Sequence, residues 1–138
     1  MSVLKGSCLC GLIEYSAQDK FKYAGYCHCS ECRKFSGSAF SAFGAIEKSD
    51  FKIIKGISSL GRYEKSQTSV VCFCKNCGSS LYGKKLETEL IHIRLGSLDS
   101  EPNLTIQAHV YKDQKAGWHI ISDSLPQFST KPEYADKI

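Results

Sequence analysis

The sequence has no long apolar segment. No run approaches the ~18 apolar residues of a membrane-spanning helix, and residues 1–11 lack the apolar core of a secretory signal peptide. We therefore expect a cytoplasmic protein that does not associate with a membrane. Thiols stay reduced in the cytosol, so disulfides or free buried thiols explain the eight cysteines less well than metal ligation or catalysis does.

Strong net charge is also lacking. The formal charge is +4 with every cysteine counted as neutral. If seven cysteines bind two zinc ions as thiolates, the added charges lower this value to about +1. So small a basic excess gives no reason to expect a nucleic-acid partner.

Helical periodicity is weak, and short β-type runs bounded by Gly, Ser, Asp and Asn dominate. We expect strands at Leu9–Ala17, Lys22–Tyr26, Ala39–Ala45, Phe51–Lys55, Leu60–Lys65, Val70–Phe73, Ser80–Gly83, Leu90–Leu95 and Thr105–Tyr111. One helical turn is expected at Glu31–Ser36. A chain of 138 residues can bury a core of its own, so the sequence predicts a single mainly β domain over residues 1–138, with loops carrying the cysteines.

The cysteines form three clusters. They are Cys8 and Cys10, then Cys27, Cys29 and Cys32, and finally Cys72, Cys74 and Cys77. Tetrahedral zinc with Zn–S bonds of about 2.3 Å needs sulfurs roughly 3.8 Å apart. A C-x-x-C-G turn at Cys74–Gly78 reaches that separation, and Cys8 and Cys10 would share one face of an extended segment. These two pairs predict a closed structural site for zinc, with iron–sulfur ligation as the alternative.

The middle cluster predicts a different kind of site. Three thiolates within six residues leave one coordination position open, as in catalytic zinc sites. His28 lies between two ligands and would point away from the metal. Cys72 is the more serious candidate for a fourth ligand, but its neighbours indicate a strand, and we predict that it does not bind zinc. An open site with three thiolates is soft and net negative, which favours a thiol substrate over activated water.

Several motifs together resemble one known family. They are Gly6–Gly11, Cys27–Lys34, Ser36–Phe40, Phe73–Ser79, His109–Tyr111, Ala116–Trp118 and Leu125–Phe128. Their ordered combination resembles the glutathione-dependent formaldehyde-activating enzyme family, which also includes centromere protein V. The resemblance covers nearly the whole chain.

The resemblance implies a β-tent fold of short antiparallel sheets, with cysteine-bearing loops, little helix and two Zn²⁺ per chain. By motif, structural zinc would be held by Cys8, Cys10, Cys74 and Cys77. Catalytic zinc would be held by Cys27, Cys29 and Cys32. The implied activity is carbon–sulfur lyase chemistry on a small thiol adduct such as S-hydroxymethylglutathione, formed from formaldehyde and glutathione. The alternative is a non-catalytic scaffold, or a protein or chromatin interaction module, with two closed zinc sites.

Four other residues could act in substrate binding or proton transfer, but each also has a simpler structural interpretation. Arg33 and Lys34 follow the middle cluster and could bind a substrate carboxylate, although solvated surface charges are the simpler interpretation. Trp118 could wall a pocket, but we expect it to pack. His109 could carry protons, and we expect a core histidine instead.

Overall fold

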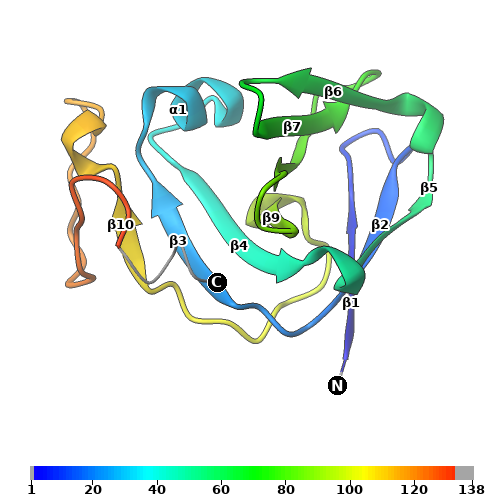
Figure 1. The fold of residues 1–138 in the computed structure, drawn as a ribbon, viewed down its shortest axis with the longest axis horizontal. Helices are drawn as coiled ribbons and strands as arrows, with labels where there is room; N and C mark the ends of the chain where they lie inside the picture. The colour runs from blue at the N-terminus through cyan, green and yellow to red at the C-terminus, as the bar shows by residue number, and fades with distance from the viewer. Residues whose placement is uncertain (1, 133–138) are drawn as a thin grey trace.

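The computed structural model describes residues 2–132 of the chain (Figure 1). The strands are β1 (Val3–Ser7), β2 (Glu14–Gln18), β3 (Tyr23–Cys27), β4 (Ser41–Glu47), β5 (Phe51–Lys55), β6 (Leu60–Glu64), β7 (Ser69–Cys74), β8 (Ser80–Lys85), β9 (Leu90–Arg94) and β10 (Ala108–Val110). The helices are α1 (Ser30–Ser36) and the short 3₁₀ helices η1 (Lys48–Asp50), η2 (Ile57–Ser59), η3 (Leu95–Ser97) and η4 (Lys112–Gln114). The predicted mainly β class with little helix is confirmed. No helix between residues 2 and 132 has the length and apolar character to cross a membrane.

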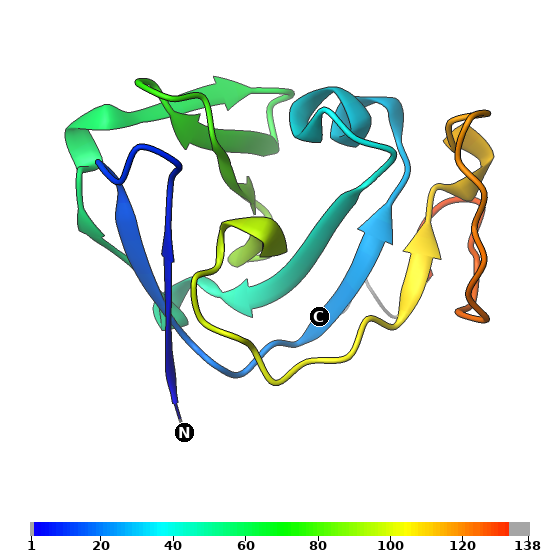
Figure 2. The same cartoon turned by 180° about the vertical axis from the view of Figure 1, so that it is seen from behind.

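The strands form two sheets. The smaller has the order β1-β2-β5, and the larger has the order β10-β3-β4-β9-β8-β7-β6. All neighbours are antiparallel except β10, which runs parallel to β3. Figures 1 and 2 show the small sheet at one end of the molecule and β10 at the other, with β3 and β4 between them. One face of the large sheet therefore packs toward the small sheet, and its other face does not take part in that packing.

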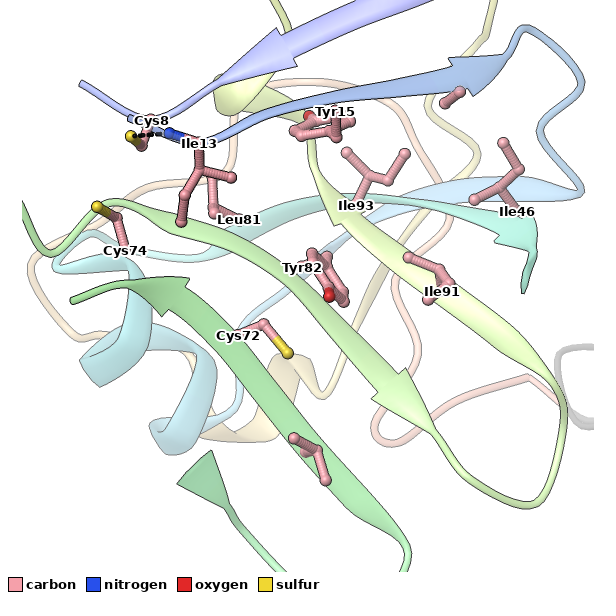
Figure 3. Close-up of a cluster of buried hydrophobic side chains, with 12 residues drawn as sticks. Cys8, Ile13, Tyr15, Ile46, Cys72, Cys74, Leu81, Tyr82, Ile91 and Ile93 are labelled. Carbon is pink, nitrogen blue, oxygen red and sulfur yellow. Dashed lines mark hydrogen bonds between the residues drawn. The ribbon is translucent and has the colours of Figure 1, made fainter. Parts of the chain in front are cut away.

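The main hydrophobic core lies between the two sheets. Its buried members are Cys8, Ile13, Tyr15, Ala17, Ile46, Val70, Cys72, Cys74, Leu81, Tyr82, Ile91 and Ile93 (Figure 3). On β9, Ile91 and Ile93 point into this core while His92 and Arg94 alternate with them, because strand side chains alternate between faces. Each fully buried Ile or Leu contributes about 1.5–3 kcal/mol. The strand alternation thus fixes which side chains reach the opposite face.

Some predicted elements differ from the structure. The strand expected at Leu9–Ala17 begins at Glu14, because residues 9–12 form the turn between β1 and β2, with Gly11 at φ +81°. The strand expected at Thr105–Tyr111 is only three residues long, and β1 was not predicted. Phe51–Lys55 agrees with its prediction.

Candidate metal centres

The first cysteine cluster joins two hairpins. Cys8 and Cys10 lie in the turn region after β1, and Cys74 and Cys77 lie at the end of β7 and in the turn before β8. The Sγ atoms of Cys8 and Cys10 are 3.6 Å apart and those of Cys10 and Cys74 are 3.8 Å apart. All four sulfurs lie within 4.8 Å of one another. These separations match the roughly 3.8 Å between ligands of tetrahedral zinc, so the donor set fits a closed site.

Backbone amides point at these sulfurs. The Ile13 N–H donates to Cys8 Sγ at 3.3 Å, as Figure 3 shows. The Cys10 N–H donates to Cys77 Sγ, and the Cys77 N–H donates to Cys74 Sγ, both at 3.5 Å. Hydrogen bonds to a charged acceptor favour the charged form. The local backbone is therefore arranged to stabilise thiolates, which are the form that binds metal.

The C-x-x-C-G turn has the predicted form. The Gly78 N–H donates to the Cys74 carbonyl at 2.8 Å, and Gly78 adopts φ +80°, which glycine tolerates without strain. A hydrogen bond from the Ser79 side chain lowers the pKa of Cys77 to about 5. The expectation of an extended segment at residues 8–10 was wrong, because these residues form a turn. That turn still brings its two sulfurs to one point.

The second cluster is local. Cys27 ends β3, Cys29 is the N-cap of α1 and Cys32 lies in the first turn of that helix. The Cys32 N–H donates to Cys29 Sγ at 3.3 Å, which is the capping interaction that starts the helix. The three sulfurs lie within 4.8 Å of one another, and no fourth Cys, His, Asp or Glu of residues 2–132 joins them. This arrangement fits a metal site with one position left open.

The three thiols compete for ionisation. Hydrogen bonds from the side chains of Cys27 and Cys32 hold the pKa of Cys29 well below its usual range. The pKa of Cys27 is raised because its side chain donates to Cys29. One sulfur thus ionises at the expense of its neighbour. A bound cation is what would stabilise all three as thiolates at once.

Cys72 and His28, the two candidate fourth ligands, both lie outside the cysteine groups. Cys72 is fully buried on β7, and Figure 3 shows it near Tyr82, apart from Cys74. Burial raises the pKa of the Cys72 thiol, which therefore stays protonated. His28 is fully buried, and burial lowers its pKa to about 4, so it is neutral at pH 7. That Cys72 does not bind zinc stays a prediction.

The second cluster opens onto a cavity of about 780 Å³ on the side of the large sheet away from the core. The strand register explains the lining, since paired residues share a face. Gly25 pairs with Phe43, and Phe43 pairs with Arg94. Gly83 pairs with His92, and all five residues line the cavity. The cavity floor is therefore built from alternate residues of adjacent strands.

Basic side chains outnumber acidic ones around the cavity. The basic residues are Lys65, Lys84, Lys85, Arg94 and Lys131, and the acidic ones are Glu31 and Glu87. Lys65 and Glu31 pair with each other at 3.2 Å, so their charges largely offset. The remaining excess is positive, which favours an anionic occupant.

Arg94 is the cation on the floor. Its guanidinium lies 5.3 Å from the centre of the Phe35 ring, and Nη1 donates to the His92 carbonyl at 3.1 Å. Its Nε is buried without a hydrogen-bond partner in the described chain. At Gly83, a Cβ would lie 3.1 Å from Nη2, so the glycine leaves room for the guanidinium. Arg94 and His92 were not predicted as site residues from the sequence, although two polar residues on one face of an otherwise apolar strand were a signal.

The other weighed residues lie elsewhere. Arg33, Lys34 and Trp118 are not among the residues lining the cavity. Trp118 is 73% exposed, so the expectation that it packs was wrong. His109 is buried as expected of a core histidine.

Comparison with known proteins agrees with this geometry. The sequence model of the glutathione-dependent formaldehyde-activating enzyme family matches residues 3–114. The chain belongs to this family. It is 34% identical over 82 residues to an uncharacterized lyase of Schizosaccharomyces pombe, covering 59% of this chain and 58% of that one. A putative glutathione-dependent formaldehyde-activating enzyme of Penicillium rubens is 30% identical over 81 residues, covering 59% and 42%. The chain spans about half the length of these relatives.

A solved structure shares the fold. The crystal structure of a Rhodobacter sphaeroides protein superposes with a TM-score of 0.61 and 23% identity. It covers 72% of this chain and 91% of the other. At this identity the match describes the architecture alone.

Proposed function

We propose that the chain is a zinc-dependent carbon–sulfur lyase acting on an anionic thiol adduct such as S-hydroxymethylglutathione. The observation that carries the proposal is the three-cysteine cluster at the edge of the cavity. Its sulfurs lie within 4.8 Å of one another without a fourth side-chain ligand from the described residues. Family membership supports the same reaction.

The donor set suggests what each residue does. A zinc ion held by Cys27, Cys29 and Cys32 would supply a soft centre with one position for a substrate thiolate. Arg94 would bind a substrate carboxylate, because this half-buried residue lines the same cavity. The sheet floor then orients the adduct and limits the access of water.

The cleavage reaction balances without an oxidant or reductant. The hydroxyl of the hydroxymethyl group loses its proton, the carbon–oxygen bond becomes double and the carbon–sulfur bond breaks. The electron pair of that bond goes to sulfur, so formaldehyde and a thiolate are released. The reverse reaction adds the thiolate to formaldehyde and takes up the proton. Holding the thiolate beside the carbonyl carbon accelerates addition by proximity.

The test is a thiol titration of the protein loaded with cobalt in place of zinc. Glutathione should shift the cobalt–sulfur absorption, because a fourth sulfur enters the site. S-methylglutathione is the matched control ligand, since it keeps both carboxylates but cannot form a thiolate, and it should leave the spectrum unchanged. Cys29→Ser should abolish the response to glutathione.

A parallel assay follows formaldehyde release from S-hydroxymethylglutathione with the zinc-loaded protein. Wild type should accelerate release and Cys29→Ser should not. The spectrum of cobalt at the three-cysteine site is the difference between wild type and Cys29→Ser. If that difference spectrum already shows four sulfurs and ignores every thiol, the lyase proposal fails and the chain is a binding module with two closed sites.

A further inference from the structure

A chain of three hydrogen-bonded side chains runs beside the three-cysteine cluster. His28 Nε2 lies 2.8 Å from His109 Nδ1. His109 Nε2 lies 3.0 and 2.9 Å from the two carboxylate oxygens of Asp123. His28 and His109 are only 0% and 1% exposed. Buried polar groups are held in place by their hydrogen bonds, so the two histidines are fixed in the interior and the partly exposed Asp123 ends the chain at the surface.

The direction of the hydrogen bonds follows from the carboxylate. Asp123 also accepts the Leu125 N–H at 3.0 Å, and the hydrogen bond with His109 lowers the pKa of Asp123. An ionised carboxylate only accepts, so His109 donates from Nε2. The chain that we infer continues with His109 Nδ1 accepting the Nε2–H of His28. In this arrangement both histidines carry the ring proton on Nε2.

The chain ties the cysteine segment to distant parts of the protein. His28 lies between Cys27 and Cys29, and its backbone N–H donates to the carbonyl of Val110, the last residue of β10, at 3.0 Å. His109 lies on β10, which makes only three residue pairs with β3, and Asp123 lies in the irregular segment after η4. Neighbouring side chains of an extended segment point to opposite sides. Anchoring the His28 ring on one side therefore sets the direction of the two flanking sulfurs on the other.

We propose that His28, His109 and Asp123 form a positioning chain that holds Cys27 and Cys29 in ligand geometry and so retains the metal of the three-cysteine site. The proposal goes beyond the lyase reaction, because it concerns metal retention and does not depend on which substrate the site takes. Asp123 is the residue to test. Its side chain is 42% exposed, so replacing it leaves no buried hole.

The experiment measures zinc release from the fully loaded protein to a chromogenic chelator. The phase absent from Cys29→Ser identifies release from the three-cysteine site. Asp123→Asn should speed that phase about tenfold, as loss of partners around metal ligands does elsewhere, and should leave the four-cysteine phase unchanged. Asp113→Asn is the matched control, because Asp113 is an exposed acid of η4 outside the chain, and it should release zinc at the wild-type rate.

Nitrogen-15 NMR of the histidine rings gives a second readout that a general structural role would not move. His28 and His109 should both carry the ring proton on Nε2 in the zinc-loaded wild type, and Asp123→Asn should change this pattern. Three results would each overturn the proposal. They are wild-type zinc release by Asp123→Asn, equal acceleration of both release phases, and an Nδ1–H tautomer at either histidine of the wild type.

Discussion

The two cysteine clusters differ in how much chain they connect. The first joins hairpins far apart in the sequence, since Cys10 and Cys74 are separated by 64 positions. The second draws all its ligands from residues 27–32. Closing a loop of 64 positions costs the unfolded chain about 2 kcal/mol more entropy than closing a six-residue turn does. We therefore expect a metal in the first cluster to stabilise the fold, and one in the second to contribute less to stability and to be available for chemistry.

Their surroundings differ in the same sense. Cys8 and Cys74 belong to the main core between the two sheets. Cys29 and Cys32 are only partly buried and line the cavity on the opposite face. The first cluster is thus anchored in the core through two of its four cysteines, although Cys10 is exposed, and the second lies beside a cavity that can admit a ligand. The predictions below test this division.

The largest effect is expected from breaking the first cluster. Cys10→Ser or Cys77→Ser should sharply reduce soluble yield and lower the thermal unfolding temperature. Zinc contributes ~10–16 kcal/mol in small zinc peptides, and less here because the chain has a core of its own. Differential scanning calorimetry and a zinc count on any soluble fraction measure the result. Wild-type thermal stability in both variants would contradict a structural role.

Breaking the second cluster should remove one zinc ion and change the stability of the fold only a little. Cys29→Ser should fold with nearly wild-type stability, but its zinc count should fall from two per chain to one. The reason is that its ligands close only a short turn, so their loss frees little chain entropy. Zinc analysis and calorimetry on the same sample test this pairing. A loss of stability as large as that of Cys10→Ser would erase the distinction between the clusters.

The sequence was informative about the clusters and silent about their surroundings. Ligand spacing grouped Cys74 with Cys77, because a C-x-x-C-G turn is a local structure. The sequence did not indicate a role for Arg94, because its contacts depend on strand register. It did not indicate one for Asp123, because its contact with His109 depends on how a distant loop packs against β10. The short parallel pairing of β10 with β3 could not be predicted either, because it joins segments that are far apart in the sequence.

A smaller effect is expected at the cavity floor. Arg94→Gln should weaken glutathione binding by about tenfold, because a charge-assisted hydrogen bond to a carboxylate is lost. Binding of cysteamine, which is a cationic thiol without carboxylates, should not weaken. Lys34→Gln is the matched control, since Lys34 is exposed and does not line the cavity. The cobalt titration reports the binding constant of each thiol for wild type and both variants. Equal weakening for both thiols in Arg94→Gln would show that Arg94 supports the site rather than recognising the anion.

The smallest effect on zinc content is expected from substitution of Cys72. As a fourth ligand, this residue would give the second cluster four thiolates like the first. Cys72→Ala should keep two zinc ions per chain, because the thiol lies in the core and joins neither cysteine group. Its stability should fall by about 1 kcal/mol, the usual size of a modest core truncation. Zinc analysis of the purified variant decides the point, with Cys29→Ser as the reference for the loss of one ion. A fall to one zinc in Cys72→Ala would mean that the second site is closed by a fourth thiolate. The open position required for a substrate sulfur would then not exist.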